Sequence, residues 1–341
     1  MDVVGPLEQG VAEGGGREMK MPLISVLMPA YNHERYVETA VRSVLDQDWP
    51  RIELLASDDG SRDGTWNALR GLKPECERKL ERVEFERHEN LGTSRTLSAL
   101  RGGAHGDYVA ILASDDAYLP GAFSRLMRPM LADADIGLTV GRNEFMDDVG
   151  NRCYWDENRE VVHDRAKARY VCFNDFIRES TGVDDRGPEF GSYSRLLRMN
   201  HVPNGMLIRK AALDRIPDFT MEAPLEDWWM HLQLSKITRY LAIPEATFRY
   251  RWHAGNTIKR TERMREYYLR TLAWEERLAE EHAESEWARA FRREYWDVRR
   301  KVGLGDAVRL DRVRTLRDRR YVLTLWGRPF TVCRREKAIR P

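Results

Sequence analysis

The chain has 341 residues, of which 42% are hydrophobic and 33% charged, and its formal net charge is +1. This length accommodates one large domain, with or without an appendage, and the composition allows a substantial core. The near-zero net charge argues against a dedicated nucleic-acid binder, because such proteins neutralise many phosphates with excess Lys and Arg.

The four cysteines lie far apart and show no Cys-x-x-Cys spacing. They indicate neither a disulfide framework nor a zinc site, and we therefore expect a cytoplasmic protein. No apolar run approaches the ~20 residues of a membrane-spanning helix. Residues 1–20 are rich in Gly and Glu and lack the apolar stretch of a signal peptide, so we expect a disordered leader.

From Met21 onward, short apolar runs alternate with amphipathic helical patterns. The pattern predicts strands at 24–28, 52–56, 83–85 and 108–113, with helices at 37–45, from about 65, and at 97–104. Strands that alternate with helices predict an α/β fold with a mostly parallel sheet covered on both faces.

After Val140 the pattern is less regular, and we expect loops over 141–200. We then expect a strand at 206–208, a helix from about 225, strands at 240–243 and 247–251, and Arg- and Glu-rich helices from Thr261. The resulting division is a leader at 1–20, a domain at 21–256 with halves 21–140 and 141–256, and a helical, basic C-terminal extension at 257–341.

Polar side chains follow three of the predicted strands, where Tyr31, Asp59 and the pair Asp115-Asp116 stand at the carboxyl ends. Ligands bind at that edge of open α/β sheets. Neighbouring carboxylates repel each other, so a divalent cation is one way to stabilise the pair, and a solvated turn is the alternative. We expect this strand end to face solvent. Asp59 could accept a hydrogen bond from a nucleobase, or its segment could be only a turn and a helix cap.

Three segments resemble the family-2 glycosyltransferases with the GT-A fold: Ile24-Ser-Val-Leu-Met-Pro-Ala-Tyr-Asn32, Ser57-Asp-Asp-Gly-Ser-Arg-Asp-Gly-Thr65 and Ala113-Ser-Asp-Asp-Ala117. Asn90-Leu91-Gly92 ahead of Arg95, Leu225-Glu-Asp-Trp-Trp229 and Tyr250-Arg-Trp-His253 extend the resemblance in the correct order over about residues 21–256.

The resemblance implies roles for matching residues. Tyr31 would stack near the base, and Asp59 would accept the N3–H of uracil or thymine. Asp116 would ligate a Mn²⁺ or Mg²⁺ ion that bridges two phosphates, with Asp115 in the ribose or metal shell. The family motif often begins with Asp where this chain has Ser114, which leaves Asp116 as the expected ligand. The residues implied to bind the nucleotide sugar are Pro29, Tyr31, Asp59, Arg95 and Asp115.

Glu226 and Asp227 resemble the family's acidic pair at the start of a helix, in which the second member acts as base. A structural explanation is also open, because a helix N-terminus stabilises carboxylates and Trp228 and Trp229 could be core residues. His253 resembles the histidine that closes the family's site as a metal ligand or phosphate contact. His33, His88, His163 and His201 have no such context.

The implied reaction is inverting, metal-assisted transfer from a UDP- or dTDP-sugar to a hydroxyl of a glycan, a lipid-linked glycan or a small molecule, in surface polysaccharide or glycan assembly. A non-catalytic sugar-nucleotide-binding scaffold is an alternative, although both acidic pairs are intact. A sugar-phosphate nucleotidyltransferase is less favoured, because Pro29-Ala30-Tyr31-Asn32-His33 lacks the glycines of a triphosphate loop.

The C-terminal section carries closely spaced arginines between apolar residues over 289–320. As a basic helix it could lie on an anionic membrane surface, which would make the protein peripheral to the membrane. The alternative is that these helices pack on the domain and their arginines pair with glutamates.

Overall fold

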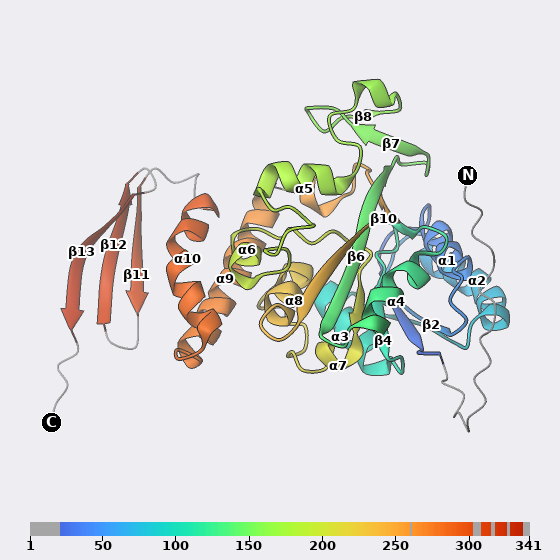
Figure 1. Ribbon diagram of the computed structural model, residues 1–341, viewed down its shortest axis with the longest axis horizontal. Coiled ribbons are helices and arrows are strands. Elements are labelled where there is room, and N and C mark those ends of the chain that lie inside the picture. Colours follow the sequence, from blue (N-terminus) through green and yellow to red (C-terminus); the bar gives the residue numbers. More distant parts are fainter. Residues whose placement is uncertain (1–20, 260, 303–307, 315–317, 326–327, 337–341) are drawn as a thin grey trace.

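The computed structural model describes residues 21–259, 261–302, 308–314, 318–325 and 328–336 (Figure 1). The expected leader lies outside these residues. Within the described part, no helix combines the length and the apolar character that crossing a bilayer requires.

The first part of the chain forms the parallel half of the main sheet, as the alternating pattern predicts. Its strands are hydrogen-bonded in the order β3-β2-β1-β4, and each neighbouring pair is parallel. The elements are β1 (Ile24–Ala30), α1 (Val37–Leu45), β2 (Ile52–Asp59), α2 (Thr65–Lys79), β3 (Arg82–His88), α3 (Thr93–Gly103) and β4 (Tyr108–Ile111).

The second half of the sheet is mixed. Beyond β4 the order continues β9-β6-β10-β5, in which β6 and β10 are parallel and the other neighbours are antiparallel. The elements are β5 (Ala117–Tyr118), α4 (Ala122–Ala132), β6 (Ile136–Met146), β7 (Arg152–Trp155), β8 (Val161–Val162), η1 (Arg165–Lys167), α5 (Phe173–Thr181), α6 (Tyr193–Arg198), β9 (Leu207–Arg209), α7 (Lys210–Leu213), α8 (Glu226–Leu234) and β10 (Arg239–Arg251).

Two expectations for this half are wrong. Residues 141–200 contain the end of β6, two short strands and three helical segments rather than loops alone. The pattern of apolar residues does not reveal the end of β6, because it contains the polar run Arg142-Asn143-Glu144. These residues are nevertheless extended, because their backbone pairs with β10. The two strands expected at 240–251 are one strand, because register shifts between Ala242 and Phe248 let β10 continue.

The C-terminal section is helical only in its first part. It contains η2 (Thr257–Lys259), α9 (Thr261–Glu281), α10 (Glu286–Val302), β11 (Val308–Arg314), β12 (Asp318–Leu325) and β13 (Arg328–Glu336). The last three form an antiparallel sheet beyond α10 (Figure 1), so a helix continuing to residue 320 is wrong. Val308 and Leu310 alternate with the charged residues Arg309 and Asp311 at the period of a strand, and β12 and β13 contain several β-branched and aromatic residues.

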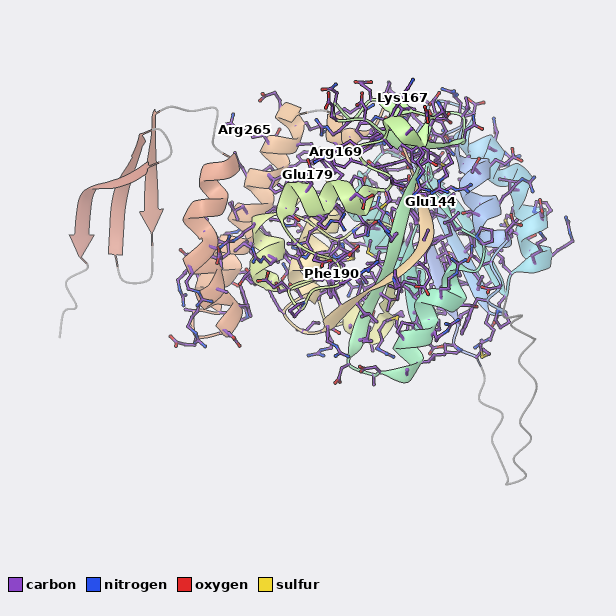
Figure 2. The ribbon with its side chains drawn as sticks, turned by 45° about the horizontal axis from the view of Figure 1, so that its top comes forward. Glu144, Lys167, Arg169, Glu179, Phe190 and Arg265 are labelled. Atoms are coloured by element: carbon purple, nitrogen blue, oxygen red, sulfur yellow. The ribbon has the colours of Figure 1, made fainter. Side chains whose placement is uncertain are left out.

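The helices α9 and α10 share a hydrophobic core with α8. Leu272 of α9 and Phe291 of α10 belong to the same buried cluster as Trp228, and this cluster also includes Phe190 (Figure 2). Arg198 of α6 forms an ion pair with Glu294 of α10, whereas Arg289 and Arg292 of α10 donate to backbone carbonyl oxygens rather than to glutamates. The described part of α9 and α10 therefore matches the expectation that these helices pack on the domain.

A buried carboxylate fastens α9 to α8. Glu275 has no exposed surface. It pairs with Lys236 Nζ at 2.6 Å and accepts hydrogen bonds from Tyr193 Oη at 2.6 Å and Gln233 Nε2 at 2.8 Å. The Lys236 ammonium also lies 3.9 Å from the centre of the Trp287 ring of α10. One network thus fixes α6, α8, α9 and α10 together.

We expect Glu275→Gln to lower the free energy of unfolding by about 3–5 kcal/mol, because it leaves the Lys236 ammonium buried without its counter-charge. Glu222→Gln makes the same change in the exposed pair with Arg277 and should cost at most about 1 kcal/mol. Urea unfolding measures both values. Equally small effects would show that the network does not hold α9 in place.

Candidate functional site

A single open cleft of about 2280 Å³ runs across the carboxyl ends of the parallel strands. Its lining includes Tyr31 after β1 and Asp59 at the end of β2. Across the cleft the lining comes from the start of α8, with Glu226 and Asp227, and from η2 and α9. Residues far apart in the sequence therefore border one space.

The loops after β1 and β2 are bonded to each other and to the loop before α3. Asp59 accepts hydrogen bonds from the backbone N–H groups of Leu91, at 2.6 Å, and Gly92, at 3.0 Å. Asn32, whose φ is +54°, accepts from the Arg62 N–H at 2.8 Å. Tyr31 is held at this turn with 42% of its surface exposed, so its ring is open to the cleft.

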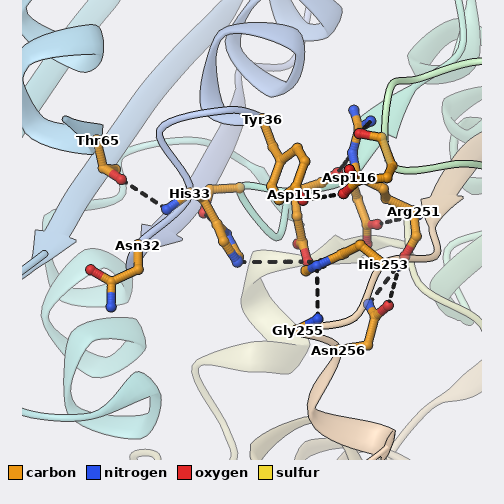
Figure 3. A network of polar contacts seen from close by, with 12 residues as sticks. Asn32, His33, Tyr36, Thr65, Asp115, Asp116, Arg251, His253, Gly255 and Asn256 are labelled. Carbon is orange, nitrogen blue, oxygen red and sulfur yellow. Dashed lines mark hydrogen bonds and ion pairs between the residues drawn. The ribbon is translucent and has the colours of Figure 1, made fainter. Parts of the chain in front are cut away.

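Asp115 lies between two histidines (Figure 3). Its Oδ2 is 3.0 Å from His253 Nε2 and 3.8 Å from His33 Nε2. One ligand atom from each of the three residues lies within 4.8 Å of the others. Burial alone would raise the pKa of Asp115, but the hydrogen bond with His253 and the nearby His33 hold it below its usual value. These three side chains are close enough together to hold a divalent cation.

The Asp116 side chain contacts neither of the two histidines. It is 1% exposed, and its oxygens accept hydrogen bonds from the Arg251 backbone N–H at 2.8 Å and from Asn204 Nδ2 at 3.4 Å. Burial, with the adjacent Asp115, raises its pKa well above the ordinary value. The expectation that this strand end faces solvent is therefore wrong for Asp116, and of the two aspartates Asp115 is the one that lies with the two histidines.

Arg251 connects the parts of this site and is a residue that the sequence pattern did not single out. The side chain donates from Nε to the Asp115 carbonyl oxygen at 2.6 Å, and from Nη1 to the carbonyl oxygens of Asp147 and Asp148 at 3.2 Å each. Its guanidinium carbon lies 4.8 Å from the centre of the Tyr36 ring. At 2% exposure it is a buried cation among aspartates.

His33 is a second residue that the sequence analysis missed. Its backbone N–H donates to Thr65 Oγ1 at 2.8 Å, and its Nδ1 lies 2.8 Å from Ser114 Oγ. The signal available in the sequence was its place two residues after Tyr31, at the same strand end. The partners that orient the ring come from elsewhere in the chain.

The acidic pair starts α8 on the opposite wall. Asp227 accepts hydrogen bonds from Asn200 Nδ2 at 3.0 Å and from the Trp228 N–H at 2.6 Å. Burial and the charge of Asp227 raise the pKa of Glu226 to about 8. Asp227 is exposed to the cleft, yet the surrounding protein desolvates it enough to raise its pKa as well.

Three of the expected nucleotide-binding residues, Pro29, Arg95 and Asp115, are not among the residues that line this cleft. Pro29 is in the body of β1, opposite Ser57 of β2, and Arg95 is exposed on the first turn of α3. The neighbouring Gly92 and Ser94 do line the cleft. Asp115 is only partly exposed, but His33 and His253 on either side of it do line the cleft.

We expect Arg251→Lys to lower the free energy of unfolding by roughly 1–3 kcal/mol, because one ammonium cannot serve all three carbonyl oxygens. Arg249→Lys, two residues earlier on β10 and half-exposed, is the matched control and should change it by less than about 0.5 kcal/mol. Denaturant titration compares the two. Equal values would mean that the guanidinium contacts contribute little.

The chain is similar to proteins of one family. The model of "Glycosyl transferase family 2" matches residues 25–182. An uncharacterized glycosyltransferase of Haemophilus influenzae is 33% identical over 135 residues, 39% of this chain and 52% of that protein. The putative teichuronic acid biosynthesis glycosyltransferase TuaG of Bacillus subtilis is 38% identical over 97 residues, 28% and 37% of the two chains.

A third relative, the GalNAc(5)-diNAcBac-PP-undecaprenol beta-1,3-glucosyltransferase of Campylobacter jejuni, is 31% identical over 110 residues, 32% of this chain and 34% of that protein. The chain spans between a third and about half of the length of these relatives. Among solved structures, the mannosyltransferase PcManGT of Pyrobaculum calidifontis, in complex with GDP-Man and Mn²⁺, aligns with a TM-score of 0.53 at 17% identity, over 76% of this chain and 65% of that one. Residues 25–182 are therefore similar to glycosyl transferase family 2, and the chain has the GT-A fold.

Proposed function

We propose that the chain transfers a sugar, with inversion at the anomeric carbon, from a UDP- or dTDP-sugar to a hydroxyl of a glycan, a lipid-linked glycan or a small molecule. The observation that carries this proposal is one cleft that Tyr31, Asp59 and the acidic pair of α8 border together. The family relatives, named for teichuronic acid biosynthesis and for an undecaprenol-linked glycan, support a role in polysaccharide or glycan assembly. Contact of the basic C-terminal section with an anionic membrane stays a prediction.

The nucleoside half of the donor fits the loops after β1 and β2. Asp59 is held by two backbone N–H groups, and each carboxylate oxygen keeps a second lone pair for the N3–H of uracil or thymine. The exposed Tyr31 ring offers a stacking surface for the base. Pro29 and Arg95 are not needed for these contacts.

The residues beside β4 fit a divalent cation. One carboxylate and two imidazoles are donors that suit Mn²⁺ or a similar ion, and we assign Asp115 and His253 as ligands, with His33 as a third. Asp116 would then act indirectly, by holding the backbone of Arg251. A cation bound there would neutralise charge on the diphosphate leaving group.

Asp227 is the base in this proposal. With a pKa of about 8, Glu226 keeps its proton at neutral pH, whereas Asp227 accepts two hydrogen bonds that favour its charged form. The ionised carboxylate accepts the proton of the acceptor hydroxyl as that oxygen bonds to the anomeric carbon and the bond to the diphosphate breaks. One displacement inverts the centre, and no covalent intermediate is required.

Two variants separate the roles of the strand-end aspartates. We expect Asp115→Asn to weaken Mn²⁺-dependent binding of UDP by at least ~10-fold, because it removes the charge between the histidines. Asp116→Asn should weaken it less and should instead lower the unfolding midpoint, since it disturbs a buried contact with β10. Calorimetric titration of UDP with Mn²⁺ measures the first effect. If only Asp116→Asn lost affinity, Asp116 rather than Asp115 would be the metal ligand.

We expect Asp227→Asn to keep donor affinity and to reduce transfer by ~10²–10⁴-fold, the usual contribution of a general base. Glu226→Gln, which preserves a neutral side chain next to it, is the control and should retain most activity. Turnover is followed as release of nucleoside diphosphate in the presence of acceptor. Near-normal turnover of Asp227→Asn would show that Asp227 is not the base and that another residue has this role. A wild-type chain that releases no nucleoside diphosphate from any UDP- or dTDP-sugar would favour the scaffold alternative.

A further inference from the structure

One wall of the cleft is uniformly basic. The charged residues that line the cleft between 254 and 268 are Lys259, Arg263 and Arg265, whereas the acidic lining residues all come from other elements. Arg265 projects from the first turns of α9 (Figure 2). The donor and its cation are assigned to the strand ends, so this wall lies on the side of the cleft that remains for the acceptor.

The two best-placed cations on this wall are held by aromatic rings. Lys259 Nζ lies 4.0 Å from the centre of the Trp252 ring, and Arg263 donates from Nε to Tyr267 Oη at 2.7 Å. Both cations are exposed, and among the described residues no carboxylate forms an ion pair with either. The rings restrict the side chains without neutralising them, which leaves their charge available to a ligand.

This basic wall begins beside the proposed base. The Tyr268 ring of α9 packs on Trp228 with ring centres 4.5 Å apart, and Trp228 directly follows Asp227. Burial, together with the charge of Asp227, raises the pKa of Tyr268 to about 12. A helix rises about 1.5 Å per residue, so Arg263 lies roughly 7–8 Å along α9 from Tyr268.

The surfaces next to these cations suit a sugar. Tyr250 and Trp252 line the cleft with part of each ring exposed, and Phe173 stacks on Tyr250 with ring centres 5.0 Å apart. Apolar ring faces in an open cleft bind the C–H faces of sugars and leave the hydroxyls for polar partners. A sugar bound beside Tyr250 would have its charged substituent next to Lys259, which lies over the Trp252 ring.

From this arrangement we propose, on the basis of the proposed function, that the acceptor is an anionic glycan. Lys259 and Arg263 bind a phosphate or carboxylate group of the same acceptor whose hydroxyl faces Asp227 across the cleft. The shared chemistry is the negative charge, and a glycosyl phosphate or a uronic acid could supply it. The Trp252 ring, over which Lys259 lies, holds that ammonium in place for the charged group.

The test uses the full chain with a UDP- or dTDP-sugar that it hydrolyses in the presence of Mn²⁺. Three acceptors with the same octyl chain are compared: a neutral glycoside, the corresponding glucuronide and a glycosyl phosphate ester. We expect at least one anionic acceptor to show a KM at least ~10-fold lower than the neutral one, and the difference to shrink as salt is raised. Whether the glucuronide or the phosphate ester is preferred identifies the source of the charge.

The double variant Lys259→Met/Arg263→Met should remove this preference while leaving donor hydrolysis without acceptor unchanged. Arg70→Met, an exposed charge loss on α2 outside the cleft, is the matched control and should keep the preference. Equal KM values for neutral and anionic acceptors, or use of the neutral acceptor alone, would overturn the proposal. So would a variant that changes only the KM of the donor, because the cations would then serve the diphosphate. Absence of donor hydrolysis in the wild type would instead count against the proposed function.

Discussion

The site depends on one buried cation. The Arg251 guanidinium is bonded to the backbone of the aspartate loop and to the turn at 147–148, and its own backbone N–H holds Asp116. A cation in such a place is stable only where several acceptors surround it, and the carbonyl oxygens supply them. The same contacts determine which neighbouring aspartate faces inward. Asp115 is thereby left between the two histidines.

Acidic and basic residues line different walls of the cleft, an arrangement that suits the binding of two substrates. Acidic groups border the strand ends and the start of α8, where a cation and a hydroxyl proton are handled in our proposal. Basic groups border η2 and α9. Since α9 is fastened to α8 through the buried Glu275, the basic residues of α9 and the proposed base are carried by two helices of one packed core. In our proposal, packing of α8 against α9 therefore sets the position of a bound acceptor relative to Asp227.

Much of the parallel half was predictable from the sequence, because buried strands and amphipathic helices alternate there with clear periods. The positions of Tyr31 and Asp59 at the cleft followed from the strand ends alone. The orientation of Asp115 and Asp116 could not be predicted, because the two residues are adjacent and the contact that separates them comes from β10. The place of His33 was missed for the same reason, since Ser114 lies 81 positions away.

The sheet order also constrains how the chain can fold. The strands β3, β2, β1 and β4 come from one continuous stretch, but the other side of β4 is covered by β9, which follows almost a hundred residues later. Until β9 is synthesised, β4 presents unpaired backbone groups along an apolar edge, and such edges readily pair with other chains. We therefore expect that a chain still being synthesised, before β9 is added, exposes β4 to pairing with other chains. Correct folding then depends on how quickly the connection between β4 and β9 brings these two strands together.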